Sequence, residues 1–119
     1  MGDRLKIQLK RIYESPERGD GYRMLIDRLW PRGISKARAR LDEWNKTLAP
    51  SPSLRKWFHE QKTGYDEFSA RYLRELQQHE AALRRVRKIS ETKKVTLLYA
   101  SKDRERNHAR VLFEALKNL

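Results

Sequence analysis

Residues 95–100 read Val-Thr-Leu-Leu-Tyr-Ala, an uninterrupted apolar run rich in β-branched and aromatic side chains. Such a run is typical of a strand that is covered on both faces, as in a parallel sheet flanked by helices. Because parallel neighbours need long crossover connections, the segments before and after it should contain helices. The run therefore predicts an α/β fold in which residues 95–100 form the central parallel strand.

Two further strands are expected earlier in the chain. Leu5, Ile7 and Leu9 alternate with polar residues, which is the period of a half-buried strand and suits the edge of a sheet. Arg11 continues the apolar face of this strand, so its guanidinium should reach the strand's end on the inward side. Residues 24–26 form a second apolar strand core. We predict a small, mostly parallel sheet of about three strands with right-handed crossovers.

Helical periods fill the remaining segments. Apolar residues three and four apart between positions 34 and 48 predict an amphipathic helix that begins at Ser35. A short helix should begin at Ser51 and Pro52, a long one should run from Tyr65 to Lys88, and a final helix should cover residues 109–119. With no internal repeat and no linker, residues 1–119 are expected to form a single α/β domain with several helices packed on the sheet.

Composition narrows the classes of function. The chain has 28 Lys and Arg against 16 Asp and Glu, a formal net charge of +12, which attracts polyanions but also serves solubility. The lack of cysteine excludes disulfides, thiolate nucleophiles and thiolate metal sites. No apolar run approaches the about 20 residues of a membrane span, and no secretory apolar region follows Met1. We therefore expect a cytoplasmic protein with no membrane partner.

The carboxyl ends of the three strands define a candidate site, because ligands of open α/β sheets bind beyond these ends. Charged and polar side chains follow all three strands, and the third is followed by the start of the last helix. A helix start beside several cations favours phosphate or carboxylate. We predict a pocket there for a phosphorylated or nucleotide-like anion. Its candidate substrate-binding residues are Arg11, Tyr13, Arg28, Trp30, Arg32, Lys102, Asp103 and Asn107.

Asp27 and His108 are the candidate catalytic residues of this pocket. An imidazole at a helix start can act as acid or base, and Asp27 ends a strand that points into the same region. Structural roles compete with this interpretation: Asp27 can pair with a neighbouring arginine, His108 can cap or pack, and Asp103 can cap a helix. No nucleotide-binding loop, nucleophile elbow or metal-ligand spacing is present, so no metal site is predicted. The cofactor is unknown, and whether the chain is an enzyme stays open.

A second interpretation assigns the basic surface to nucleic acid. Nonspecific phosphate contacts need only exposed lysines and arginines, and Trp30 stands between two arginines in a pattern that suits base stacking, although tryptophans are also core anchors. No helix-turn-helix or RNA-binding signature is present. A concave cluster of charge at the strand ends would favour the pocket, whereas a broad stripe that includes residues 84–88 would favour nucleic acid. The sequence leaves the oligomeric state open.

Two motifs give the chain a family resemblance. Residues 27–33 read Asp-Arg-Leu-Trp-Pro-Arg-Gly, and Lys-Asp at 102–103 precedes Asn-His-Ala at 107–109. Through these motifs nearly the whole chain resembles the YeaO-like branch of the domain of unknown function 488. The resemblance implies a small α/β fold, whereas the family's biochemical role is itself unassigned. Broader relatives often carry cysteines where Tyr99 and Asn107 stand here, so no thiol-based mechanism is implied.

Overall fold

Four parallel strands form one sheet in the computed structural model, which describes residues 6–61 and 64–119. Their order in the sheet is β1, β4, β2, β3. The strands are β1 (Ile7–Arg11), β2 (Tyr22–Leu25), β3 (Glu43–Trp44) and β4 (Val95–Tyr99). The predicted α/β class, the edge position of β1 and the interior position of β4 are confirmed, and β3 adds one strand to the expected three. Leu5, which was predicted for the first strand, lies outside the described residues.

The strand register gives the sheet two different faces. Leu97 of β4 lies opposite Leu9 on one side and Met24 on the other, and all three face the main core. Side chains alternate along a strand, so Leu98 and Leu25 lie on the second face, in a smaller core. All five residues of β4 are buried, which explains why this run lacks the polar alternation of an exposed strand.

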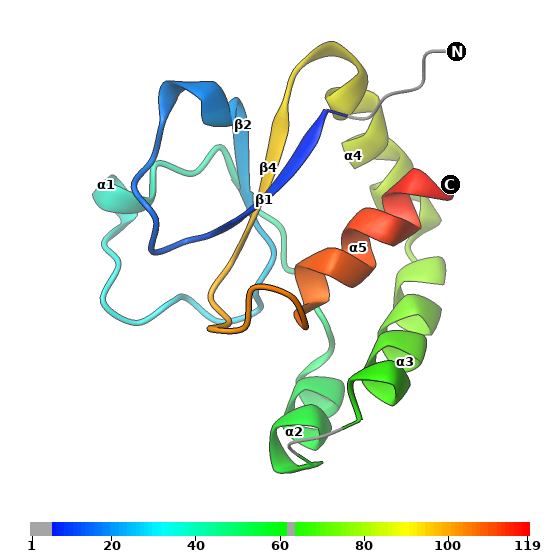
Figure 1. The fold of residues 1–119 in the computed structure, drawn as a ribbon. Coiled ribbons are helices and arrows are strands. Elements are labelled where there is room, and N and C mark those ends of the chain that lie inside the picture. Colours follow the sequence, from blue (N-terminus) through cyan, green and yellow to red (C-terminus); the bar gives the residue numbers. More distant parts are fainter. Residues whose placement is uncertain (1–5, 62–63) are drawn as a thin grey trace.

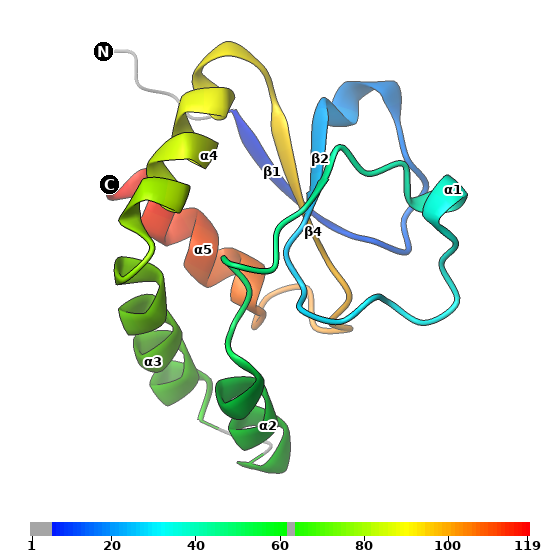
Figure 2. The same ribbon diagram turned by 180° about the vertical axis from the view of Figure 1, so that it is seen from behind.

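Helices cover the main face, and loops cover the second face. Figures 1 and 2 show α3 (Tyr65–Gln77), α4 (Glu80–Thr92) and α5 (His108–Lys117) together on one side of the sheet, with α1 (Lys36–Ala39) on the other side. Helix α2 (Pro52–Gln61) packs beside α3, where Phe58 stacks on Phe68 with ring centroids 4.4 Å apart. The helices predicted from Ser51 and for residues 109–119 are confirmed as α2 and α5. None of the described helices has the length and apolar character to cross a bilayer.

The long helix predicted from Ser35 is wrong. Only α1 forms, and its cap residue Arg40 adopts a left-handed backbone with φ of 48°. The chain then turns into β3, because the amides of Asp42 and Asn45 donate to carbonyls of β2, at 2.8 Å each. Leu41 and Trp44 still pack against the second face. The helical spacing of these apolar residues therefore indicated that they are buried, although the segment is not a helix.

The helix predicted from Tyr65 to Lys88 is two helices. Helix α3 ends at Gln77 and α4 begins at Glu80, although Leu76 and Leu83 are both buried and keep a helical spacing. The residues at the break, Gln-Gln-His-Glu at 77–80, are exposed and have no apolar anchor in the core. The chain can therefore change direction there while the apolar stripe on each side stays buried.

A buried ionic cluster lies on the second face of the sheet. The carboxylate of Asp20 accepts from Lys10 Nζ at 3.0 Å and from Arg23 Nη1 at 2.5 Å, and these three side chains are 7% exposed or less. Burial alone would raise the pKa of Asp20, but a backbone N–H and the two cations outweigh it and lower that pKa. Arg23 also donates to the carbonyls of Ala39 and Arg40, which ties the end of α1 to the sheet.

Candidate functional site

Asp27 is the centre of the carboxyl edge of the sheet. One of its carboxylate oxygens accepts from the amide of Ala100 at 2.8 Å, and the other lies 3.1 Å from His108 Nε2. The same nitrogen lies 2.9 Å from the carbonyl of Ile26. A carbonyl can only accept, so the proton of the neutral imidazole belongs on Nε2, which leaves Nδ1 as the acceptor. The two predicted catalytic residues are therefore in contact, and Asp27 joins β2, β4 and α5.

The Asp27–His108 pair lies on a buried aromatic floor. The side chains of Asp27 and His108 are 17% and 10% exposed, and the ring of Tyr72 meets the imidazole edge-on with centroids 6.2 Å apart. Burial first, and then the charge of Asp27, hold the pKa of Tyr72 well above its ordinary value. Its hydroxyl donates to the carbonyl of Leu48. Tyr72 is therefore a neutral support for the Asp27–His108 pair.

Arg11 and Tyr13 fasten three chain segments together at the same edge. Arg11 donates from Nε to the carbonyl of Ser101 at 2.8 Å and from Nη2 to the carbonyl of Ala100 at 3.2 Å. Its guanidinium also lies over the ring of Tyr13, 4.9 Å from the centroid. The Tyr13 hydroxyl donates to the carbonyl of Arg32 at 3.0 Å. These contacts bring β1, the loop after β4 and the segment around Arg32 side by side.

Arg28 and Trp30 lie on the flank of the edge and bind backbone groups. Arg28 donates to the carbonyls of Pro50 and Ala49 at 3.1 and 3.2 Å, which anchors the segment that leads into α2. Trp30 donates from its indole nitrogen to the carbonyl of Ile34 at 2.6 Å, and its ring packs edge-on against Trp44. Both side chains therefore shape the edge, and Trp30 is one of the core anchors considered above.

Asp103 and Asn107 shape the loop between β4 and α5. The carboxylate of Asp103 accepts from the amides of Glu105 and Arg106 at 2.9 Å each, and these bonds lower its pKa. Asn107 caps α5, because its side-chain oxygen accepts from the amide of Arg110 at 3.0 Å. Its side-chain nitrogen donates to the carbonyl of Asp103 at 2.9 Å. The helix-cap role considered for Asp103 therefore belongs to Asn107, and Asp103 instead orders the loop before α5.

The remaining side chains give the edge an excess of positive charge. Arg104 of the loop is neutralised by Glu14 at 2.7 Å. Arg11, Arg32 and Lys102 form no ion pair within residues 6–61 and 64–119, and Arg32 and Lys102 are exposed. We call these three the cationic rim. The rim residues follow the same strand ends as the Asp27–His108 pair, and backbone contacts tie these segments together. Seven of the ten predicted residues therefore lie along this edge, with Arg28 and Trp30 on its flank and Asn107 at the start of α5.

The basic residues of α4 are largely occupied by other contacts. Arg84 pairs with Glu80 and Arg85 pairs with Glu43, each at 2.7 Å. Arg87 donates to the carbonyl of Leu119 at 2.8 Å. Two of the four cations in the stripe at 84–88 that would have favoured nucleic acid are therefore paired with carboxylates.

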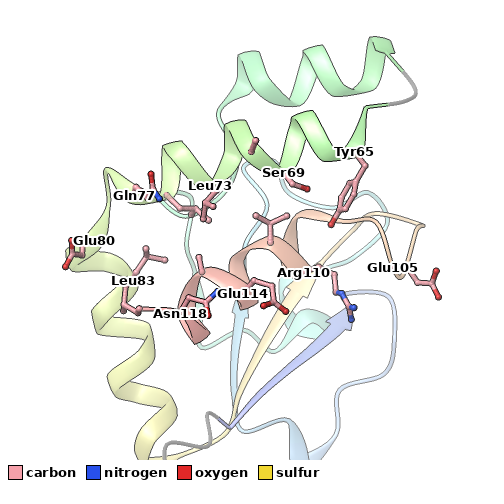
Figure 3. Close-up of a pocket in the computed structure, with 15 residues that line it drawn as sticks. Tyr65, Ser69, Leu73, Gln77, Glu80, Leu83, Glu105, Arg110, Glu114 and Asn118 are labelled. Carbon is pink, nitrogen blue, oxygen red and sulfur yellow. The ribbon is translucent and has the colours of Figure 1, made fainter.

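A large hollow lies away from the edge. Figure 3 shows it between α3, α4 and α5, where it has a volume of about 670 Å³ and an apolar floor that includes Leu73, Leu83 and Val111. It contains none of the ten predicted site residues, and neither does a smaller hollow of about 250 Å³ beside Gly64. The only sequence signal for the large hollow was Leu73, an apolar residue that interrupts the polar side of its helix and is 38% exposed.

Backbone groups are the part of the site that sequence analysis missed. The amide of Ala100 and the carbonyl of Ile26 hold the Asp27–His108 pair, and neither has a side-chain signature. Within the described residues, no group of three or more His, Asp or Glu side chains is placed to hold a metal ion.

Comparisons with known proteins identify the family. Residues 6–119 match the family described as "Inactive DUF488-N3 subclade". "Uncharacterized protein YeaO" of Escherichia coli (strain K12) is 48% identical over 115 residues, which cover 97% of this chain and 100% of that protein. "Uncharacterized protein Rv3073c" of Mycobacterium tuberculosis (strain ATCC 25618 / H37Rv) is 41% identical over 111 residues, or 93% of each chain. No solved structure matches the chain. The resemblance predicted from the motifs is confirmed: the chain belongs to the DUF488 family, in a subclade described as inactive.

Proposed function

We propose that this protein binds phosphate-bearing anions at the carboxyl edge of its sheet and holds them without transforming them. The observation that carries the proposal is the cationic rim, whose members follow the ends of β1, β2 and β4. The Arg11 side chain is fixed by bonds to two carbonyls, and the backbone of Arg32 is held by the Tyr13 hydroxyl. Arg11 uses Nε and Nη2 on carbonyls of the β4 loop, which leaves Nη1 for a ligand. A guanidinium fixed in this way loses little conformational entropy when it binds an anion.

Binding without turnover agrees with the chemistry of the edge. Both oxygens of Asp27 are engaged, and His108 shares its Nε2 between Asp27 and a carbonyl. The chain contains no cysteine that could act as a nucleophile. The subclade to which the chain belongs is described as inactive. A rim that binds an anion beside a pair whose Asp27 oxygens and His108 Nε2 are already in contact with other groups suits a sensor or carrier of phosphate groups better than an enzyme.

A thermal-shift measurement tests the proposal. Inorganic pyrophosphate, a nucleoside monophosphate and short DNA and RNA are screened at physiological salt, and ligand at 100 times its dissociation constant adds about 2.7 kcal/mol of stability. Arg32→Ala should lose most of the shift, because it removes one of the three rim cations. The matched control is Arg55→Ala, which removes the same charge from an exposed position on α2. An equal shift in the wild type and both variants would contradict the proposal.

Acid–base catalysis by Asp27 and His108 is the second candidate function, and the 3.1 Å contact between them favours it. In this alternative, Nδ1 of His108 takes a proton from a water molecule that attacks the phosphorus of a bound phosphate monoester, the P–O ester bond breaks, and the alcohol leaves with a proton while inorganic phosphate remains. Phosphorus NMR of the protein mixed with phosphoesters distinguishes the two candidates. Binding alone predicts unchanged ester resonances over days, whereas a new inorganic phosphate resonance that disappears in His108→Gln would establish catalysis.

A further inference from the structure

We infer that the anion held at this edge is the backbone of a nucleic acid, and that the connection between β2 and β3 is the surface along which it continues. The inference rests on the proposed function and names its ligand. Residues 28–41 of this connection contain five cations and no acidic residue, whereas acidic residues bound the run at Asp27 and Asp42. A polyanion meets a continuous stretch of positive charge there.

The cations of α1 are exposed on a fixed backbone. Lys36, Arg38 and Arg40 are exposed, and none forms an ion pair in the part of the chain that the structure describes. Ser35 caps the helix through the amide of Arg38. The buried Arg23 holds the carbonyls at its end. We call Lys36, Arg38 and Arg40 the α1 cations. Because their backbone is already ordered, binding restricts only side chains.

The connection joins the α1 cations to the cationic rim. Figures 1 and 2 both show its first part, after β2, next to the loop between β4 and α5, from which it runs to α1 on the side away from α3, α4 and α5. Tyr13 holds the carbonyl of Arg32 at the midpoint of this path. A single phosphate group can contact only the rim. A polymer with a phosphate at every unit can contact the rim and the α1 cations together.

The surface suits the phosphate backbone more than the bases or a membrane. Trp30 is half-buried, packs edge-on against Trp44 and donates its indole N–H to the carbonyl of Ile34, so its contacts are those of a core anchor. Leu29 is 59% exposed beside the rim, and among the described residues the other exposed large apolar side chain, Leu73, lies on α3. A helix or loop that enters a membrane interface needs an apolar face of several side chains. Nonspecific binding of nucleic acid needs only exposed lysines and arginines that can contact successive phosphates.

Salt dependence of binding measures the number of phosphate contacts. Fluorescence anisotropy with a labelled duplex of about 20 base pairs, between about 50 and 200 mM salt, gives a slope of about −0.9 for each phosphate contacted. Lys36→Gln/Arg38→Gln/Arg40→Gln should make the slope shallower by about 2.7, because it removes three contacts. Arg55→Gln/Lys56→Gln/Lys88→Gln is the control, since it removes three positive charges from exposed positions on α2 and α4. The control should keep the wild-type slope.

The outcomes separate this inference from the proposed function. If pyrophosphate still stabilises the wild type but the duplex does not bind, the ligand is a small anion and the inference is overturned alone. If the α1 variant and its control change the slope equally, the surface assigned here is wrong. Binding to phosphatidylserine vesicles but not to DNA or RNA would replace nucleic acid with a membrane surface. The expected result is a shallower slope in the α1 variant only, with its pyrophosphate shift retained.

Discussion

Replacement of Asp20 by Asn should destabilise the fold severely, because two buried cations depend on this carboxylate. Asp20 bridges Lys10 and Arg23, and the three side chains are 2%, 7% and 5% exposed. Asn has nearly the same shape, so the substitution removes the charge and little of the packing. Arg23 would then remain buried with no carboxylate partner, and Lys10 would keep only the exposed Glu17.

The expected cost of Asp20→Asn follows from the burial of these charges. Removal of one partner from a buried ion pair costs about 3–5 kcal/mol. A domain of this size has a total unfolding free energy of about 5–15 kcal/mol, so the variant should approach the limit of folding. With a denaturant slope of about 2 kcal/mol per molar urea, the midpoint should fall by about 2 M.

The pH dependence of the same pair gives an independent check. The pKa of Asp20 is lowered from its ordinary value of 3.8, so its stabilisation is complete above that value and is lost as the pH falls through the folded-state pKa. Burial alone would lower the pKa of Lys10, but its bonds to Asp20 and Glu17 raise it above 10.5. Stabilisation by Lys10 is therefore present below 10.5 and is lost as the pH rises through the raised value. The gap in stability between wild type and Asp20→Asn should narrow below the ordinary aspartate pKa.

Equilibrium urea unfolding at neutral and acidic pH measures this effect, with Glu17→Gln as the control. Glu17 also contacts Lys10, at 3.0 Å, but its side chain is 73% exposed. Such an exposed pair contributes about 0–1 kcal/mol, so the control midpoint should shift little. A midpoint for Asp20→Asn within the range of the control would refute the claim that the cluster is buried and coupled.

Three further substitutions test other parts of the structure. Gly21→Ala should cost at least about 1 kcal/mol in urea unfolding, because Gly21 has φ of 66° and a Cβ there would collide with the carbonyl of Lys94; an unchanged midpoint would contradict this. Tyr13→Phe should weaken pyrophosphate binding severalfold in calorimetry, while the unfolding free energy from urea titration falls by less than about 1 kcal/mol, since the bond to Arg32 is exposed. Unchanged affinity would show that the bond between Tyr13 and Arg32 does not matter for binding. Arg11→Lys keeps the charge but cannot reproduce the two bonds to carbonyls, so affinity should fall, whereas wild-type affinity would mean that charge alone is sufficient.

Sequence patterns predicted the parts of the fold that local periodicity determines. The apolar run of β4, the alternation along β1 and the stripe of α5 each reflect burial of one short segment, and each element is confirmed. Strand β3 was missed because it has only two residues and is formed by pairing with β2. The ionic cluster was missed for a similar reason. Lys10 alternates with the apolar residues of β1, which is typical of a residue that faces solvent, and only the folded chain brings Asp20 into contact with it.

The candidate site was predictable as a location but not as a set of contacts. The rule that ligands bind beyond strand ends was enough to select Asp27 and His108, which the structure brings within 3.1 Å. It could not show that Arg11 and Arg28 donate to carbonyls, because backbone acceptors have no sequence signature. The large hollow depends on the angles at which three helices pack, and helical periodicity contains no information about those angles.

The most direct test of anion binding at the carboxyl edge is a map of amide chemical shifts during titration with inorganic pyrophosphate. Binding at the cationic rim predicts that the largest changes fall at residues 11–13, 28–33 and 100–103, and that they saturate at one ligand per chain. Changes concentrated instead along α3 and α5, around the large hollow, would place the ligand elsewhere. No change at millimolar pyrophosphate would contradict the account as a whole.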